Sequence, residues 1–238
     1  YLENRISNLY LRHLFSLCQN LPPKEPNLLK HQKKSDKKLS LDGIGLAAHS
    51  SPMTSLWYSL VITATTLSGP VPSSSRSKAS ISRVKPQLES QLKTQNLQWG
   101  SPIFIRIFKE SNELEVWLQK DATFSHFKTY PICYFSGKLG PKLEQGDGQS
   151  PEGFYYVTPA RMNPASTFHL SFNLGYPNQY ERNLGRTGNY LMVHGDCVSI
   201  GCYAMTDAQI EEIYALASAA LEHGQPYFRV HSFPFRMT

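Results

Sequence analysis

A run of alternating side chains constrains the fold of this chain more than any other sequence feature. Residues 101–109 (SPIFIRIFK) alternate three isoleucines with Phe, Arg and Phe, the period of two that is typical of a β-strand. Residues 113–120 (ELEVWLQK) alternate in the same way, and residues 110–112 between them predict a hairpin turn. Aromatic and β-branched residues predict further strands in residues 129–135, 153–159, 166–174, 190–194 and 226–235.

One helix is predicted, over residues 207–223. Thr206 precedes it and Gln209 follows three residues later, which is the capping-box pattern of a helix start, and Gly224 follows its end. Its apolar stripe consists of Ile210, Ile213, Tyr214, Ala217 and Leu221. We therefore predict a mainly β domain over residues 99–238, a β-rich mixed-sheet sandwich or barrel-like fold with one main α-helix.

Residues 1–98 differ from the rest of the chain in charge and composition. They carry 13 Lys and Arg against 5 Asp and Glu, whereas residues 99–238 carry 11 against 13. The basic excess lies outside the β-rich part, which argues against nucleic-acid binding by that part. We interpret residues 1–52 as a disordered extension, residues 53–68 as a candidate signal peptide and residues 69–98 as a linker.

The signal-peptide interpretation rests on residues 56–67 (LWYSLVITATTL). This apolar run is shorter than the roughly 18 residues of a transmembrane helix and matches a signal-peptide core. A buried strand is the alternative. In the linker, Gly, Pro and Ser predict no packed core, and Leu88 and Leu92 predict at most a short helix. Removal of residues 1–98 is therefore expected to leave stability and activity near their original values.

Residues 194–203 (HGDCVSIGCY) hold the most specific motif of the chain. His194, Cys197 and Cys202 offer three zinc ligands, but a structural zinc site needs four, usually from paired cysteines, and we predict no metal and no cofactor. A disulfide can join Cys197 to Cys202 or to Cys133, and the sequence leaves this choice open. An odd number of cysteines in the β-rich part leaves at least one thiol free.

The third interpretation of the motif is a nucleophile with its base. A free thiol has a pKa of about 8.5, so a useful thiolate at neutral pH needs a nearby imidazole or fixed dipoles. His194 ends a predicted strand and Cys202 comes shortly before the helix. Gly195 and Gly201 permit the tight loop that brings them together, and main-chain N–H groups around Gly201 and Cys202 are candidates for binding an oxyanion.

The motif resembles the signature of the YkuD-type L,D-transpeptidase catalytic domain, in which His-Gly precedes a Ser-x-Gly-Cys element. His194-Gly195 matches the first part, and Ser199, Gly201 and Cys202 match the second. Residues 136–157 are similar to the family's glycine-rich segment, and residues 172–188 (FNLGYPNQYERNLGRTG) are similar to its YafK-like branch. The resemblance covers about residues 100–238.

This resemblance implies a peptidoglycan-modifying enzyme of the periplasm. In the family, the cysteine attacks a carbonyl beside the L-centre of diaminopimelate in a peptidoglycan stem peptide, and an amine or water resolves the thioacyl enzyme. The YafK-like branch is associated with hydrolysis, which releases a lipoprotein joined to peptidoglycan through a diaminopimelate–lysine amide. The implied partners are thus stem peptides and such a lipoprotein. The alternative is a non-catalytic peptidoglycan-binding module.

Two positions depart from the broad family pattern, and both concern the acceptor. Ile200 replaces the usual His before Gly-Cys, and Ala204 replaces an Arg often found two residues after the Cys. These departures favour the hydrolase. The catalytic residues that the resemblance implies are Cys202, His194, Gly195 and Gly201, and the candidate substrate-binding residues are Arg182, Arg186, Ser199, Tyr203 and Lys142. His169 is interpreted as a structural residue on a strand.

An ion pair between Cys202 and His194 is a further expectation. Opposite charges favour each other's ionised form, so a thiolate–imidazolium pair lowers the pKa of the thiol and raises the pKa of the imidazole.

Overall fold

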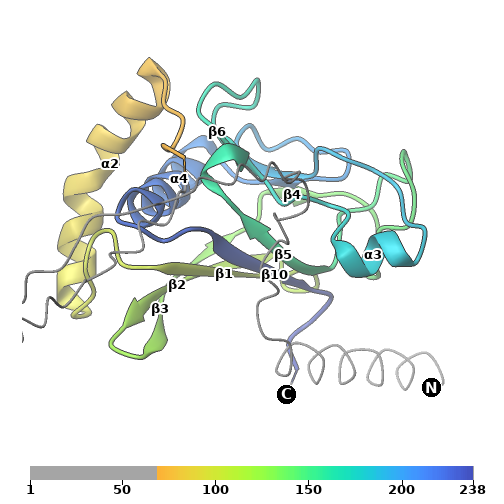
Figure 1. Cartoon of the computed structure of the whole chain (residues 1–238), viewed down its shortest axis with the longest axis horizontal. Coiled ribbons are helices and arrows are strands. Elements are labelled where there is room, and N and C mark those ends of the chain that lie inside the picture. The colour runs from red at the N-terminus through yellow and green to blue at the C-terminus, as the bar shows by residue number, and fades with distance from the viewer. Residues whose placement is uncertain (1–68, 238) are drawn as a thin grey trace, which may run out of the picture. The chain divides into compact units, whose positions relative to one another are not determined.

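The computed structural model of the chain describes residues 69–237, so the predicted extension (1–52) and signal peptide (53–68) lie outside the described residues. Two five-stranded sheets and three α-helices make up the described part (Figure 1). No helix within it is long and apolar enough to cross a membrane.

The first sheet contains the two strands that the alternation predicts most clearly. Its strand order is β3-β2-β1-β10-β5, with bounds Thr123–Pro131, Glu113–Lys120, Ile103–Phe108, Phe228–Phe233 and Gly153–Val157. β1 pairs antiparallel with β2 and parallel with β10, so the sheet is mixed. The three isoleucines of β1 are at most 1% exposed and face the core, which confirms the predicted period of two.

The second sheet consists of short strands and carries the motif. Its order is β4-β9-β8-β7-β6, with bounds Tyr134–Phe135, Tyr203–Ala204, Met192–His194, Ser171–Asn173 and Met162–Asn163. β8 and β9 are parallel, and the other pairs are antiparallel. The strand expected over residues 166–174 is confined to β7. His169 has φ 64°, a left-handed conformation that interrupts a strand, so its placement on a strand was wrong.

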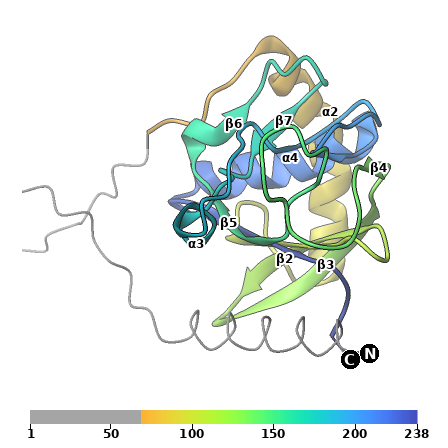
Figure 2. The same ribbon diagram turned by 90° about the vertical axis from the view of Figure 1, so that its right-hand side faces the viewer.

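The predicted helix is confirmed as α4 (Asp207–Glu222), with the Thr206–Gln209 capping box at its start. It lies between the two sheets, where it contacts β1 on one side and β7 and β8 on the other (Figure 2). Because both sides are covered, the helix is buried on more than its apolar stripe. Two shorter helical segments are α3 (Gln179–Asn183) and the 3₁₀ turn Pro159–Arg161.

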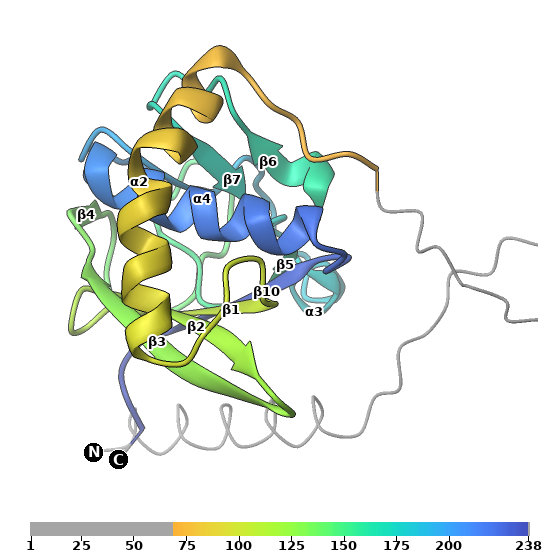
Figure 3. The same cartoon turned by 90° about the vertical axis from the view of Figure 1, so that its left-hand side faces the viewer.

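A second long helix, α2 (Ser75–Thr94), occupies the segment that was expected to be a linker. It packs across α4, as Figure 3 shows, and Leu88 and Leu92 are at most 1% exposed. Ser77 and Ser80 are also buried, and such small side chains let the two helices approach closely. The composition argument failed because it treated serines as unable to pack, whereas Ser77 and Ser80 are buried on this helix. Because α2 contributes buried leucines to the core, we now expect removal of residues 69–98 to lower the stability of the domain.

Truncation of Leu88 tests this packing. The Leu88→Ala variant is expected to lose about 2–5 kcal/mol of unfolding free energy, since a fully buried leucine leaves a cavity. The neighbouring exposed Gln87→Ala is the control, expected within about 0.5 kcal/mol of the parent. Urea unfolding of the full chain measures both, and equal midpoints for the two variants would show that α2 does not belong to the core.

Candidate active site

The parallel pairing of β8 with β9 brings the motif's two ends together. Val193 pairs with Tyr203 and His194 with Ala204. Because side chains alternate along a strand, Cys202, which immediately precedes Tyr203, falls on the sheet face that carries His194. The backbone N–H of Met192 lies 3.4 Å from Cys202 Sγ, which places the thiol beside β8. His194 and Cys202, eight positions apart in sequence, are thus diagonal neighbours on this sheet face.

His194 is held in a defined tautomer. Its side chain is buried, and Nδ1 lies 2.6 Å from the Gly195 carbonyl oxygen. A carbonyl only accepts hydrogen bonds, so Nδ1 must carry the proton and Nε2 keeps a free lone pair. The Phe168 ring packs on the imidazole with the ring centroids 4.7 Å apart. The ring is therefore fixed with its acceptor nitrogen available.

Burial determines the protonation state of the His194 imidazole and of the Cys202 thiol. It lowers the pKa of His194 below 6.5, against weaker opposing effects of the Gly195 carbonyl and Asp196. Burial likewise raises the pKa of the Cys202 thiol, while the Met192 N–H and the Lys142 ammonium oppose this shift. Both directions are opposite to those expected for an ion pair. The resting site thus holds a neutral thiol and a neutral imidazole.

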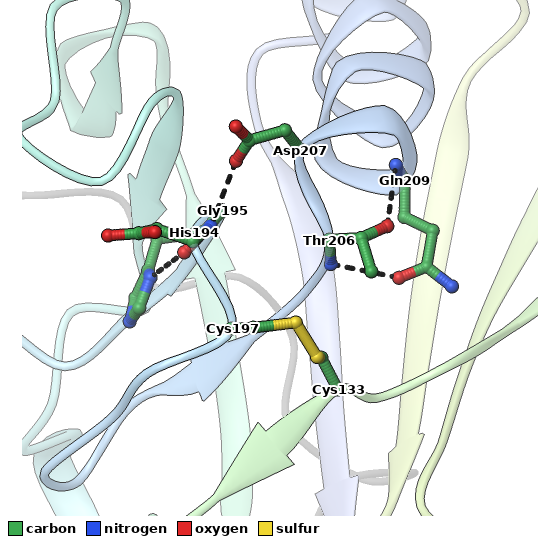
Figure 4. Close-up of a disulfide and its surroundings, with 8 residues drawn as sticks. Cys133, His194, Gly195, Cys197, Thr206, Asp207 and Gln209 are labelled. Atoms are coloured by element: carbon green, nitrogen blue, oxygen red, sulfur yellow. Dashed lines mark hydrogen bonds between the residues drawn. A yellow bond between two sulfur atoms is a disulfide. The ribbon is translucent and has the colours of Figure 1, made fainter.

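The loop between β8 and β9 is fixed by a disulfide and by backbone hydrogen bonds (Figure 4). Cys133 and Cys197 form the disulfide, with Cα atoms 5.3 Å apart, so Cys202 is the free cysteine of the described residues. Asp207 Oδ1 accepts from the Asp196 N–H at 2.9 Å. The disulfide resolves the choice that the sequence left open and removes Cys197 from any metal site.

The two glycines of the motif are required by geometry. A Cβ on Gly195 would lie 2.5 Å from Asp207 Oδ1 and 3.1 Å from Ile210 Cγ2, so a side chain there would collide with the start of α4. Gly201 has φ +107°, which L side chains rarely adopt. These positions let the loop turn back within eight residues.

The main-chain donors that were expected to bind an oxyanion are already engaged. The Gly201 N–H donates to Ser136 Oγ, and the Cys202 N–H donates to Ser199 Oγ at 2.7 Å. That expectation is corrected: within the described residues, the main-chain donor aimed at the thiol is the Met192 N–H.

Comparison with known proteins agrees with this geometry. Residues 103–224 match the model of the YkuD L,D-transpeptidase catalytic domain, a span that includes the whole motif. This chain belongs to the YkuD family. YafK of Escherichia coli strain K12 is 49% identical over 139 residues, which are 58% of this chain and 56% of YafK, so the chain spans little more than half of that relative's length. The same figures hold for YafK of Escherichia coli O157:H7.

Solved structures show weaker similarity to this YkuD-family chain. The helical cell shape determining protein Pgp2 of Campylobacter jejuni (K307A mutant) is 21% identical with a TM-score of 0.47, covering 57% of this chain and 48% of that one. Bd1075 of Bdellovibrio bacteriovorus is 22% identical with a TM-score of 0.40, covering 57% and 49%.

Two of the predicted substrate-binding residues of this YkuD-family domain have internal roles in the structure. Ser199 Oγ both accepts from the Cys202 N–H and donates to the Cys202 carbonyl at 2.8 Å, so it fixes the backbone of Cys202. Tyr203 is fully buried, and its hydroxyl lies 2.7 Å from both the Pro151 carbonyl and Ser232 Oγ. The expectation of substrate contact is wrong for Tyr203, because strand alternation turns it away from Cys202.

The cationic candidates lie in different surroundings. Lys142 is buried, and its ammonium contacts Asp147 and the Glu144 carbonyl. Its positive charge also acts to lower the pKa of the Cys202 thiol. Arg186 has its guanidinium 3.9 Å from Glu181, a carboxylate of the domain itself. Arg182 donates to neighbouring groups of α3, including Gln179 Oε1 at 3.2 Å. For Arg182 and Arg186, substrate binding stays a prediction.

Sequence reasoning missed the residues that support the site from outside the motif. Ser150 Oγ donates to the Cys202 carbonyl at 2.9 Å and accepts from the Ser136 N–H. Ser150 was noted only as part of the family's glycine-rich segment. His169 bonds through Nε2 to Glu211 Oε1 at 2.7 Å, which agrees with its interpretation as a structural residue. No group of three or more His, Cys, Asp or Glu in residues 69–237 is placed to hold a metal.

The protonation state of the site predicts how Cys202 reacts with iodoacetamide. The labelling rate should rise with a midpoint above the ordinary thiol value of about 8.5, since burial disfavours the thiolate. His194→Ala should not raise this midpoint further, because no imidazolium is present to be lost. Peptide mass spectrometry of Cys202 against pH gives both curves. A midpoint below 8.5 that rises in His194→Ala would instead establish the ion pair.

Loss of the disulfide is expected to destabilise the loop without removing the chemistry. The double variant Cys133→Ser/Cys197→Ser should lose about 2–4 kcal/mol of unfolding free energy, because the bridge closes a chain segment of 64 residues. Denaturant unfolding with and without reductant measures this. The parent should lose a similar amount in reductant and the double variant nothing more. A parent that is insensitive to reductant would contradict the bridge.

Proposed function

We propose that this chain is a cysteine-dependent peptidoglycan-modifying enzyme that acts at the L-centre of diaminopimelate in stem peptides. Membership of the YkuD family supports the substrate class. The observation that carries the chemistry is the bond from His194 Nδ1 to the Gly195 carbonyl, which leaves Nε2 as a neutral base on the face that carries the free Cys202 thiol.

Acylation follows from this arrangement. The Cys202 proton moves to His194 Nε2 as Sγ bonds to the carbonyl carbon and the carbonyl electrons move to oxygen. When the tetrahedral species collapses, the carbon–nitrogen bond breaks and the departing amine takes the proton from Nε2. General-base catalysis of this kind contributes about 10²–10⁴-fold to the rate. A neutral resting imidazole suits the role because it is ready to accept the proton.

Deacylation reverses the proton path with water as the nucleophile. Water gives a proton to His194 Nε2 as its oxygen bonds to the thioester carbon, and the carbon–sulfur bond then breaks. The departing Cys202 sulfur recovers the proton, and the product is a carboxylic acid. With an amine in place of water, the same steps form a new amide, which is L,D-transpeptidation.

We favour water as the acceptor. Ile200 stands where the family commonly has His, and its side chain is 89% exposed, so it offers an amine acceptor no hydrogen bond at that position. Ala204 likewise provides no guanidinium. The proposed substrate is the amide that joins diaminopimelate to a lysine of a peptidoglycan-attached lipoprotein. A periplasmic location is part of this proposal, and the Cys133–Cys197 disulfide is consistent with an oxidising compartment.

Muropeptide analysis tests the proposal. The full chain, incubated with lipoprotein-bearing peptidoglycan, should release the lipoprotein's lysine-terminated peptide, and mass spectrometry should find few new cross-links. Cys202→Ala should abolish release while unfolding like the parent, and His194→Ala should reduce it by about 10²–10⁴-fold. The matched control is His126→Ala, an exposed histidine of β3. New cross-links would identify a transpeptidase instead. Peptidoglycan binding without turnover, equally strong in Cys202→Ala, would identify a binding module.

A further inference from the structure

The N-terminal end of α2 reaches a loop that lies beside the catalytic histidine. Ser74 Oγ, at the helix cap, donates to the Pro164 carbonyl at 2.7 Å. Arg76 Nη1 donates to the Ser166 carbonyl at 2.7 Å and to the His169 carbonyl at 2.9 Å. One guanidinium thus spans the loop of residues 164–170 and fixes two of its carbonyls by charge-assisted hydrogen bonds, which are stronger than neutral ones.

The same loop contacts His194 in two ways. The Phe168 ring packs on the imidazole at a centroid distance of 4.7 Å. The Phe168 carbonyl also accepts from the Gly195 N–H at 3.0 Å, and the Leu170 carbonyl accepts from it at 3.3 Å. Gly195 supplies the carbonyl that holds His194 Nδ1. The loop therefore fixes both the face of the ring and the peptide that orients it.

A second set of bonds clamps the loop from α4. His169 Nε2 lies 2.7 Å from Glu211 Oε1, and Glu211 also accepts from Ser80 and Arg83 of α2. The loop is thus held by side chains of two helices. α2 contributes to the first set of bonds through Arg76 and to the second through Ser80 and Arg83, which bind Glu211. Arg76 is the side chain of α2 that bonds to the backbone on both sides of Phe168, because Ser166 precedes and His169 follows that residue.

We propose that Arg76 is a positioning residue that holds loop 164–170 against His194, so that Nδ1 stays on the Gly195 carbonyl and Nε2 remains the unprotonated ring nitrogen. Arg76 touches no reacting atom and lies outside residues 103–224, the part that matches the family model. The proposal rests on the proposed function for its kinetic consequence, while the arrangement of His194 can be tested without turnover.

The test compares Arg76→Ala with Lys78→Ala in the full chain. Lys78 is exposed on the same helix, so its loss removes the same charge without touching the loop. In Arg76→Ala the loosened loop should admit water to the imidazole, and the pKa of His194 should rise toward its ordinary value of about 6.5. NMR titration of the His194 ring, assigned with His194→Ala, measures this. Lys78→Ala should titrate like the parent.

Turnover supplies the second readout. In Arg76→Ala, kcat should fall between about 10- and 100-fold with KM little changed, because a misplaced base affects the chemical step. Arg76→Lys should recover part of the loss, since one ammonium can still donate to one carbonyl. Unfolding midpoints verify that the variants are folded at the assay temperature. If Arg76→Ala fails to fold, Arg76→Lys and Ser74→Ala carry the comparison.

The outcomes separate this proposal from the proposed function. If Arg76→Ala keeps the parent's His194 titration and kcat, Arg76 does not position the histidine. A fall in kcat that Lys78→Ala shares would overturn the proposal too, as it would mark a general charge effect. If the parent turns over no stem peptide, the proposed function fails, and the His194 titration still decides for or against Arg76.

Discussion

The site depends on a parallel strand pair joined by an unusually short connection. Parallel neighbours normally need a crossover of about a dozen residues or more, yet β8 and β9 are joined by the loop 195–202. The loop returns so quickly because Asp196, Cys197 and Gly201 adopt positive φ values of 69°, 44° and 107°. For a residue such as Cys197 this conformation costs on the order of 1–3 kcal/mol, so the surrounding structure must hold it in place.

The backbone of Cys202 is held through a residue that directly follows a strand of the first sheet. Lys109, directly after β1, is fully buried, and its ammonium lies 2.6 Å from the Lys138 carbonyl, 3.1 Å from those of Gly140 and Ser150, and 3.0 Å from Glu152. Burial lowers its pKa, and the neighbouring Glu152 opposes that shift. The segment gathered around this ammonium contains Ser136 and Ser150, whose hydroxyls bond to the Gly201 N–H and the Cys202 carbonyl. A buried cation thus connects the end of β1, the central strand of the first sheet, to the backbone of Cys202.

The elements that sequence reasoning predicted are those specified by local pattern. β1, β2 and α4 each carry a period or cap within a few residues, so no distant contact is needed to recognise them. α2 lacks a strong apolar stripe, and its buried face includes Ser77 and Ser80. Ser80 bonds to Glu211 of α4, a partner that the local sequence does not reveal. Tyr203 illustrates the same limit within the motif: adjacency to Cys202 suggested the substrate, whereas alternation in a two-residue strand turns it into the core. The motif and its family resemblance could be recognised from the sequence, but the residues that hold it in place, 40 to 100 positions away along the chain, could not.

Cys202 and His194 are therefore anchored by different parts of the molecule. The backbone of Cys202 is fixed by the segment that Lys109 gathers, and the ring of His194 is fixed by loop 164–170, which α2 and α4 hold. Their shared element is the β8–β9 register. Because both groups rest uncharged, no ion pair draws them together, and their relative position depends on these separate anchors. A neutral pair is reactive only if the proton's path from Sγ to Nε2 is already short and aligned when the substrate binds. Any such alignment has to come from the hydrogen bonds that hold the backbones of the two residues, and not from electrostatic attraction.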